Sequence, residues 1–597
     1  MATSDTSNTK FARDAWLRAL RRTAVIDGQP DVTLPVLIQQ LAQQYEAAPA
    51  LESHQSRMSY RELSARCNQY SHWGIAQGLR PGDTVALVMG NCPEYLAIWI
   101  GLSRIGVAVA LANTHLRGEA LAHSLARVTP KLAIVDGAGE RALSEAWGAM
   151  VAPAIFVQGM AAPQCRSQHL EFSGCSSEPL NAAERALPAL DSTALYIYTS
   201  GTTGLPKAAR VSHYRVMQWS HWFAGMLDIG PIDRMYDCLP LYHSVGGVVA
   251  TCATLVGGGS VVIREQFSAS DFWRDVRDQG CTLFQYIGEL CRYLTNAAPQ
   301  PGETEHALRI ACGNGLRADI WETFRTRFSI PRIVEYYAAT EANFSLYNCE
   351  GEPGAIGRTP AFLTQKQPVA LLRFDAHRGE PTRNDQGFCE TCAVGEVGEA
   401  VGLIPDAGAT RTGRFEGYTD EVASVAKILR HVFREGDCWY RTGDLMRRDE
   451  RGFFYFVDRI GDSYRWKGEN VATAEVLAVL ASARDVIDAL VYGVRVPGTD
   501  GRAGMAALVA GPNFDLQHFR DDVAMRLPDY ARPLFLRLVP ALELTGTFKP
   551  RARDFEVASF NPAACADPLF VHDGGTGVYR PLDTALYAAI CEGRFRL

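Results

Sequence analysis

The sequence lacks both a long uninterrupted apolar run and an excess of positive charge. Its longest apolar region, residues 94–113, follows Pro93 and is interrupted by Arg104, which favours a buried helix and a strand over a membrane-spanning segment. The formal net charge is −7, so the chain has no overall basic field of the kind that attracts nucleic acid. We therefore expect neither an integral membrane protein nor a nucleic-acid-binding protein.

The sequence also lacks the signals of a secreted protein and of a structural zinc site. The chain opens with MATSDTSNTKFARDAW, which has no apolar stretch behind a basic end, and we interpret its 15 cysteines as reduced and intracellular. Cys389 and Cys392 have zinc-like local spacing, but no second Cys/His pair stands nearby in the sequence to complete four ligands. We expect loop cysteines and a cytoplasmic protein.

One short segment leaves a membrane surface open as a partner. Over residues 11–22, apolar side chains recur at helical spacing and arginines lie largely on the other side: Phe11, Ala15, Trp16, Ala19 and Leu20 against Arg13, Arg18, Arg21 and Arg22. Such a helix can lie on the inner face of a membrane or pack on its own protein. We keep both interpretations for an N-terminal extension over residues 1–30.

What the sequence does contain is a long alternation of strands and helices. A chain of 597 residues should divide into domains. Its apolar runs include TVALVMG, KLAIVDG, ALYIYTS and GSVVIRE, and helical stretches separate them, which indicates βαβ units and mainly parallel sheets. Short strands and Gly-rich turns begin near Arg383. The prediction is an α/β fold, with a large N-terminal domain over residues 31–458 that includes a small β-rich part, and a smaller α+β domain over residues 459–597.

A strand, a loop of small residues and a lysine indicate a phosphate site in YIYTSGTTGLPKAA. A Walker loop has glycine directly before its lysine and a hydroxyl directly after it. Here Pro206 precedes Lys207 and Ala208 follows it. We therefore expect a phosphate cradle of a different kind.

Three further stretches offer groups that a nucleotide needs. VEYYAATEANF sets two aromatic rings just ahead of a hydroxyl and a carboxylate, which could stack a base and hold magnesium. YRTGDL places Asp444 in a tight glycine turn, where its carboxylate could accept hydrogen bonds from a ribose diol. LTGTFKPRAR contains Lys549 near the end of the smaller domain. Taken singly, each also fits a turn, a capped strand or a solvated charge.

Together and in this order, these stretches resemble the adenylate-forming superfamily, from about residue 35 to about residue 555. The strings YIGELCRYL, CGNGLR, DRIGDSYRWKGENVATAEV and GRAGMAA are similar to the fatty acid transport protein group, also called very-long-chain acyl-CoA synthetases. The resemblance implies two half-reactions in one site. ATP and a carboxylic acid give acyl-AMP and pyrophosphate, and coenzyme A then gives acyl-CoA and AMP. It also implies that the smaller domain is a mobile lid that rotates between the two steps.

By motif position, the resemblance implies a set of ATP- and AMP-binding residues. They are Thr199, Ser200, Gly201, Thr202, Thr203, Gly204 and Lys207 in the loop that grips pyrophosphate, Gly313, Asn314, Gly315, Tyr336 and Tyr337 around the adenine, and Asp444 and Arg459 near the ribose. Tyr337 would stack on the base and Thr340 would bind the α-phosphate. Glu341, helped by Thr199, would hold Mg²⁺.

The resemblance also implies catalytic and acyl-binding residues. Lys549 would bridge the acyl carboxylate and the α-phosphate during adenylation. His243, in LPLYHSVGG, stands at a position beside the reacting carboxylate that can gate the acyl pocket. Tyr286 and Gly288, in FQYIGELCRYL, would border the acyl tunnel. A structural role explains His243 equally well, and core packing explains Tyr286 and Gly288 equally well.

The lid carries the points at which the sequence departs from the superfamily. Gly461 stands where many relatives have Asp or Lys, and Asp462 follows it, so the hinge is one of these two residues. Glycine suits a backbone that must change its dihedral angles. Gly468 fits a close approach of the pantetheine arm of coenzyme A. The role of Asn470 stays open, because other branches have Arg or Trp there.

The sequence therefore predicts a long-chain or very-long-chain fatty acyl-CoA synthetase that uses ATP, Mg²⁺ and coenzyme A. A bile acid or steroid side chain is the alternative substrate, and a fatty-acyl-AMP ligase that stops at the adenylate is an alternative reaction. A non-enzymatic fatty acid carrier would leave Lys549, Glu341 and the phosphate loop without purpose. The sequence leaves the acyl chain length and the oligomeric state open.

Overall fold

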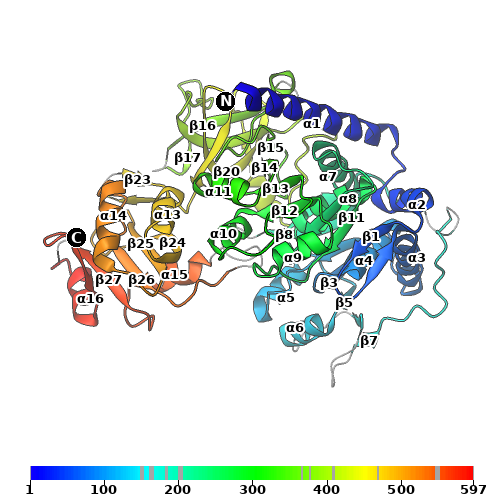
Figure 1. The fold of residues 1–597 in the computed structure, drawn as a ribbon, viewed down its shortest axis with the longest axis horizontal. Coiled ribbons are helices and arrows are strands. Elements are labelled where there is room, and N and C mark those ends of the chain that lie inside the picture. Colours follow the sequence, from blue (N-terminus) through cyan, green and yellow to red (C-terminus); the bar gives the residue numbers. More distant parts are fainter. Residues whose placement is uncertain are drawn as a thin grey trace. The chain divides into compact units, whose positions relative to one another are not determined.

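The computed structural model describes residues 2–147, 154–159, 167–181, 184, 186–199, 206–364, 368–375, 378–406, 410–466, 469–499, 501–544, 551–595 and 597. The chain forms two compact units (Figure 1). The first unit comprises Met1–Pro368, Gly402–Arg430 and Asp437–Tyr440, and the second comprises Val369–Val401, His431–Gly436 and Arg441–Leu597. The predicted limits at residues 30 and 458 remain a prediction.

Two mainly parallel sheets form the centre of the first unit. The eight-stranded sheet has the order β15 (Leu346–Asn348), β14 (Ile333–Tyr337), β13 (Ile310–Asn314), β12 (Leu283–Ile287), β10 (Arg234–Asp237), β11 (Ser260–Ile263), β1 (Pro49–Glu52) and β2 (Arg57–Ser59). The seven-stranded sheet has the order β7 (Gln168–His169), β6 (Ala154–Val157), β5 (Leu132–Val135), β3 (Thr84–Val88), β4 (Ala108–Leu111), β8 (Thr193–Thr199) and β9 (Lys207–Ser212). The apolar runs TVALVMG, KLAIVDG, ALYIYTS and GSVVIRE supply β3, β5, β8 and β11, as the sequence predicts.

Helices connect and cover these strands. They are α1 (Ala2–Gly28), α2 (Leu34–Tyr45), α3 (Tyr60–Ala76), α4 (Pro93–Arg104), α5 (Gly118–Ala126), α6 (Gly137–Trp147), α7 (His213–Met226), α8 (Thr251–Val256), α9 (Phe272–Asp278), α10 (Gly288–Asn296), α11 (Ala318–Arg327) and α12 (Glu421–Val425), with a π-helical turn at Val245–Ala250 and a 3₁₀ turn at Ala361–Leu363. The long apolar region becomes α4, buried along its whole length, and then β4. Within the described part of the chain, no helix is long and apolar enough to span a membrane.

The N-terminal helix α1 packs along α7 (Figure 1). The ring of Trp16 meets Trp222 edge-on, with the ring centres 5.5 Å apart, and Ala19 is fully buried. Gly225 on α7 permits this approach, because a Cβ there would lie 2.6 Å from the Cα of Ala19. Arg18 Nε also donates a hydrogen bond to the Gly225 carbonyl at 3.1 Å. The apolar face of the predicted amphipathic helix therefore packs on its own protein.

The second unit contains a five-stranded sheet and part of a six-stranded one. The six-stranded sheet comprises β16 (Val369–Asp375), β17 (Glu380–Pro381), β18 (Val397–Leu403), β19 (Ile428–Arg430), β20 (Cys438–Arg448) and β21 (Phe454–Arg459), of which β19 belongs to the first unit and β18 and β20 contribute residues to both. The hairpin of β22 (Tyr464–Trp466) and β23 (Glu469–Val471) follows. The five-stranded sheet comprises β24 (Val486–Val494), β25 (Ala503–Ala510), β26 (Phe535–Leu538), β27 (Leu569–Asp573) and β28 (Val578–Pro581). Its helices are α13 (Thr473–Ala481), α14 (Leu516–Arg526), α15 (Ala552–Ala558) and α16 (Thr584–Cys591).

Candidate functional site

The parallel register of β12, β13 and β14 gathers predicted adenine-site and acyl-site residues at one sheet edge. Tyr286 pairs with Gly313, and Gly313 pairs with Glu335. All three strands end within a few residues of these pairs, and the carboxyl ends of parallel strands are the edge at which open α/β sheets bind ligands. The sequence motifs YIGEL, GNG and EYY are therefore neighbours in space, although 22 residues separate the first from the second and 19 separate the second from the third.

A buried glutamate holds this edge together. Tyr286 Oη donates to Glu335 Oε2 at 2.5 Å, and the backbone N–H groups of Gly315 and Leu316 donate to Glu335 Oε1. Burial raises the pKa of the Glu335 carboxyl to about 8, while these three hydrogen bonds act in the opposite direction. Glu335 thus fixes the loop that follows β13, which is the loop predicted to line the adenine slot.

The two predicted acyl-border residues lie directly against that loop. A Cβ placed on Gly288 would lie 1.7 Å from the Gly315 carbonyl oxygen, and a Cβ on Gly313 would lie 2.4 Å from the Tyr286 ring. Gly315 has φ of 81°, a conformation that glycine adopts without strain. Tyr286 and Gly288 therefore support the predicted adenine loop through tight contacts, and their place at the acyl tunnel stays a prediction.

The two tyrosines at the end of β14 face opposite sides of the sheet, because successive strand residues alternate. Tyr336 is buried, and its ring meets Phe223 of α7 edge-on with centres 4.8 Å apart. Tyr337 is half-buried, with its ring centre 6.1 Å from that of Phe344. Of the two, Tyr337 keeps a surface on which a base could stack, as expected, whereas Tyr336 serves the core.

Thr340 and His243 are brought close by a residue that the sequence did not single out. The hydroxyl of Ser244, the neighbour of His243, lies 3.1 Å from the Thr340 hydroxyl. Arg215 Nη1 donates to the Thr340 carbonyl at 3.0 Å, which fixes the backbone there. The residue that follows the predicted gate of the acyl pocket therefore contacts the predicted α-phosphate ligand.

A second unpredicted residue, Tyr418, joins the two candidate magnesium ligands. Its hydroxyl donates to Glu341 Oε1 at 2.7 Å, and it also forms a side-chain hydrogen bond with Thr199. Burial and the adjacent Glu341 carboxylate both raise the pKa of the Tyr418 phenol. Lys207 Nζ lies 5.7 Å from the centre of the Tyr418 ring. A carboxylate and a hydroxyl offer the oxygen ligands that Mg²⁺ prefers, so these residues fit the predicted metal.

The predicted phosphate loop closes the hairpin of β8 and β9. Thr199, the last residue of β8, pairs directly with Lys207, the first residue of β9. Both ends of the loop are thereby fixed, and both lie beside Tyr418. The loop residues Ser200, Gly201, Thr202, Thr203 and Gly204 lie outside the described residues.

The predicted ribose-binding pair lies in the second unit. Arg459 Nε donates to Asp444 Oδ1 at 3.2 Å, and the two residues face each other across β20 and β21. Asp444 lies inside the continuous strand β20, which corrects the expectation of a tight turn there. Gly443, with φ of 75°, accounts for that expectation, because it changes the backbone direction without ending the strand.

The two hinge candidates follow β21. Gly461 has φ of 101°, with no atom within 4 Å of where its Cβ would be, and its carbonyl accepts a hydrogen bond from Arg502 at 3.0 Å. The N–H of Asp462 donates to the Arg459 carbonyl at 3.1 Å. A side chain at position 461 would be strained in this conformation, so Gly461 fits a pivot. Gly468, Lys549 and the side chain of Asn470 lie outside the described residues.

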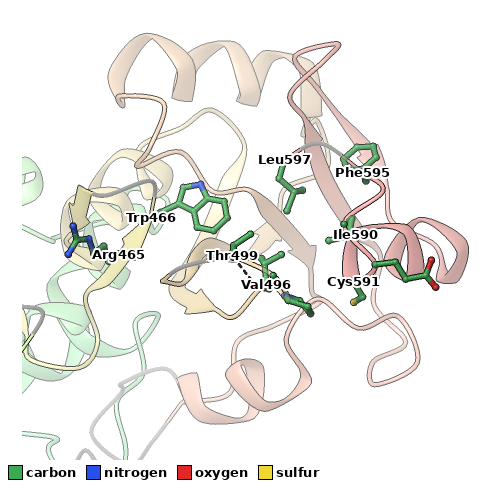
Figure 2. A pocket seen from close by; sticks show the side chains of 12 residues that line it. Arg465, Trp466, Val496, Thr499, Ile590, Cys591, Phe595 and Leu597 are labelled. Atoms are coloured by element: carbon green, nitrogen blue, oxygen red, sulfur yellow. Dashed lines mark hydrogen bonds between the residues drawn. The ribbon is translucent and has the colours of Figure 1, made fainter.

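A cavity of about 600 Å³ lies in the second unit, and part of its lining is close in sequence to Gly468 (Figure 2). Three segments surround it: the end of β22, the loop after β24, and the end of α16 with the chain terminus. Its lining includes Arg465, Trp466, Val496, Thr499, Ile590 and Phe595. It therefore combines apolar walls with a guanidinium group.

Comparison with known proteins places this chain in a family. The model of the AMP-binding enzyme family matches residues 38–385, and that of the AMP-binding enzyme C-terminal domain matches residues 475–549. The chain belongs to the AMP-binding enzyme family. Among its relatives, long-chain fatty acid transport protein 1 of Mus musculus is 39% identical over 95% of this chain and 88% of its own length. The medium/long-chain-fatty-acid–CoA ligase FadD6 of Mycobacterium tuberculosis is 37% identical over 92% of this chain and 89% of its own length.

The fold of this AMP-binding enzyme matches solved structures over most of its length. The crystal structure of the anthranilate CoA ligase AuaEII in complex with anthranoyl-AMP superposes with a TM-score of 0.74, at 19% identity, over 88% of this chain and 97% of that one. This likeness confirms the predicted α/β fold. The family models and the relatives confirm the adenylate-forming superfamily and the enzyme class of AMP-forming acid–thiol ligases.

Ser244, Glu335 and Tyr418 are the candidate site residues of this AMP-binding enzyme that sequence reasoning missed. Ser244 stands beside His243 in a motif that was already singled out, and Glu335 stands beside Tyr336 in another. For both residues, the neighbouring motif residue was therefore a signal of a place in the site. Tyr418 stands in EGYTD, which has no local feature that separates it from an ordinary turn, and its partner Glu341 is 77 residues away.

Proposed function

We propose that this chain is a long-chain or very-long-chain fatty acyl-CoA synthetase that forms an acyl-AMP intermediate. The observation that carries the proposal is the convergence of Thr340, Glu341 and Thr199 through Ser244 and Tyr418. These are the groups that an ATP-dependent attack by a carboxylate needs. The names of the two relatives, a long-chain fatty acid transport protein and a medium/long-chain-fatty-acid–CoA ligase, support a fatty acid as the substrate.

The chemical task explains the arrangement of these residues. A carboxylate must approach a polyphosphate of the same charge, so the site has to neutralise charge at the α-phosphate. Bound Mg²⁺ would supply part of that neutralisation, and Glu341 with Thr199 would hold it. The Thr340 hydroxyl would position the α-phosphate beside His243, where the acyl carboxylate would lie. Tyr418, as a donor to Glu341, would keep that carboxylate in place.

The cavity of the second unit supports coenzyme A as the second substrate. Coenzyme A carries phosphates and an adenine, which suit the Arg465 guanidinium and the apolar walls beside Trp466. We expect Arg465→Ala to raise KM for coenzyme A several-fold while acyl-AMP formation stays unchanged. An unchanged KM would remove this cavity from the coenzyme A site.

The experiment that tests the proposal is a pyrophosphate-release assay with and without coenzyme A, across a panel of acids. The panel contains fatty acids of increasing length, a bile acid and an aromatic acid. The proposal expects turnover to be highest with a long or very long fatty acid, to need Mg²⁺ and to yield AMP. Highest turnover with the bile acid would contradict the substrate. Release that coenzyme A does not accelerate, with no acyl-CoA formed, would indicate a ligase that stops at the adenylate.

A further inference from the structure

A buried carboxylate on β18, which the sequence did not single out, holds the part of β20 that leads to the predicted ribose ligand Asp444. Glu399 is 0% exposed, and it accepts hydrogen bonds from the Arg441 guanidinium, from Nε at 3.0 Å and from Nη2 at 2.7 Å. Its Oε1 also accepts the backbone N–H of Gly443 at 3.3 Å. One side chain of β18 therefore contacts two of the three residues that precede Asp444.

The residue between these two, Thr442, extends the support to Asp444 itself. Its hydroxyl donates to the Ala400 carbonyl at 2.7 Å and accepts the Asp444 N–H at 2.9 Å. Glu399 and Ala400 are neighbours on β18. Two adjacent residues of this strand therefore fix the backbone of β20 on both sides of Gly443.

This part of β20 depends on such side-chain contacts because its backbone is irregular. Gly443 has φ of 75°, and the register between β20 and β21 shifts between Leu445 and Met446. Irregularities of this kind change the direction of a side chain and are frequent beside active sites. The direction of the Asp444 side chain therefore depends on the contacts that hold the irregular backbone in place.

The Asp444 side chain has little freedom to choose its own direction. It is 8% exposed, and its Oδ1 accepts from Arg459 Nε at 3.2 Å. A short, buried carboxylate points where its backbone directs it, so a small displacement of the backbone would move its oxygens away from a bound diol. Stability alone explains the Glu399–Arg441 pair poorly, because the cost of removing two charges from water largely offsets their attraction.

We propose that Glu399 is a positioning residue for the ribose of ATP. Together with Thr442, it holds Asp444 at the angle at which one carboxylate can accept from both ribose hydroxyls. The proposal rests on the adenylating function argued above and on Asp444 as the ribose ligand. Glu399 is closed off from solvent and acts through Asp444, so its effect is confined to nucleotides that carry the diol.

The test compares ATP with 2′,3′-dideoxy-ATP, which lacks both ribose hydroxyls, in the pyrophosphate-release assay with the full-length protein. Glu399→Gln has one acceptor oxygen where the carboxylate has two, so it cannot hold both Arg441 and Gly443. We expect kcat/KM for ATP to fall roughly tenfold, the lower end of what a hydrogen bond to a charged group contributes, and kcat/KM for dideoxy-ATP to stay unchanged. Thr442→Val keeps the shape of the side chain but offers the Asp444 N–H no acceptor, and it should give the same result.

The matched control is Glu303→Gln, in the first unit and outside the candidate site. Glu303 is 13% exposed, and it accepts from Arg327 Nε and Nη2 at 3.0 Å each and from the Gln300 N–H at 3.0 Å. It therefore loses the same kinds of contact as Glu399→Gln. Scanning calorimetry of each variant measures the cost in Tm, and the control should lower Tm without changing the preference for ATP over dideoxy-ATP.

A smaller preference for ATP in Glu399→Gln and in Thr442→Val, but not in Glu303→Gln, is the expected result. An equal fall with both nucleotides would leave Glu399 with a structural role alone and overturn the proposal, as would an unchanged preference. A wild type that makes no acyl-AMP contradicts the proposed function. A wild type that makes acyl-AMP equally well from both nucleotides contradicts Asp444 as the ribose ligand and overturns this further inference, while the proposed function stands.

Discussion

Tyr418 shows how single residues complete a site whose parts lie far apart in the sequence. It hydrogen-bonds Glu341 and Thr199 and lies beside Lys207, so it joins the phosphate-loop motif to the motif that contains Glu341. Glu335 has the same role on the adenine side, through Tyr286 and Gly315. Both residues are buried. Their role is to position other groups that would contact the substrate.

Tyr418→Phe should impair adenylation by releasing the Glu341 carboxylate. A hydrogen bond to a charged group is worth about 1.5–3 kcal/mol, so we expect acyl-AMP formation to slow roughly 10- to 100-fold and to need more Mg²⁺. The measurement is the Mg²⁺ dependence of single-turnover acyl-AMP formation. Tyr455→Phe is the control, because it removes a tyrosine hydroxyl that bonds Asp449 in the second unit. Equal rates for Tyr418→Phe and the wild type would exclude Tyr418 from positioning Glu341.

Glu335 should make stability depend on pH. Its pKa is about 8 in the folded chain, against an ordinary value of 4.5. Between these values the folded chain holds a proton that the unfolded chain has released, so the contribution of Glu335 to stability falls as the pH rises from 4.5 to 8. Glu335→Gln cannot ionise, yet its amide oxygen can still accept from Gly315 and Leu316. Scanning calorimetry at pH 5.5 and pH 8 should show a smaller pH difference in Tm for this variant than for the wild type. The same pH difference in both would contradict the assignment.

At the scale of elements, α10 and the loop after β13 approach so closely that only glycine fits at position 288. The sequence suggests that a large side chain at Gly288 would block the acyl tunnel and favour shorter acids. The structure adds that even Gly288→Ala would press on the Gly315 carbonyl. Overpacking of this kind typically costs 1–3 kcal/mol. We therefore expect Gly288→Ala to raise KM for ATP.

The control for that variant is Gly230→Ala, because no atom lies within 4 Å of a Cβ at Gly230. The measurement is KM for ATP together with the chain-length profile in the acid panel. A shift toward shorter acids at an unchanged KM for ATP would favour the tunnel role and contradict the loop contact as the main function of Gly288.

The packing of α1 gives a prediction about the membrane surface. Trp16 is 3% exposed and contacts Trp222 and Tyr347. Truncating a buried tryptophan typically costs 3–5 kcal/mol, so Trp16→Ala should lower Tm by several degrees. Because this face is already buried, binding to anionic vesicles should not change. Weaker vesicle binding at an unchanged Tm would instead support the membrane interpretation of residues 11–22.

The same elements show what the sequence can and cannot predict. Strands such as β3 and β8 can be predicted from the sequence, because a buried parallel strand needs a continuous apolar stretch. The two faces of α1 could be predicted from their spacing, but its partner α7 could not, because that contact joins residues about 200 positions apart. Ser244 and Tyr418 were missed because their contacts with Thr340 and Glu341 also join residues far apart in the sequence. Asp444 was misplaced because Gly443 was taken to end a strand that in fact continues through it.

At the scale of the whole molecule, the proposal requires two units that perform two half-reactions in turn. The first unit holds the candidate magnesium, phosphate and adenine residues. The second holds Asp444, Arg459, the hinge candidates and the cavity proposed for coenzyme A. Lys549, in the match to the AMP-binding enzyme C-terminal domain, would enter the site during adenylation and leave it before thioester formation. In a rigid active site, Lys549 would be present during both half-reactions. In the mechanism proposed here, it acts in adenylation alone.

The most direct test of that claim is single-turnover kinetics of both steps in Lys549→Ala and in Gly468→Leu. Losing a donor at a developing charge typically slows a reaction about 100- to 1000-fold, so Lys549→Ala should lose most acyl-AMP formation. It should still convert supplied acyl-AMP to acyl-CoA at the wild-type rate. Gly468→Leu should show the reverse pattern, because its side chain would obstruct the pantetheine arm. If Lys549→Ala slows both steps equally, the rotation of the second unit between the two half-reactions is contradicted.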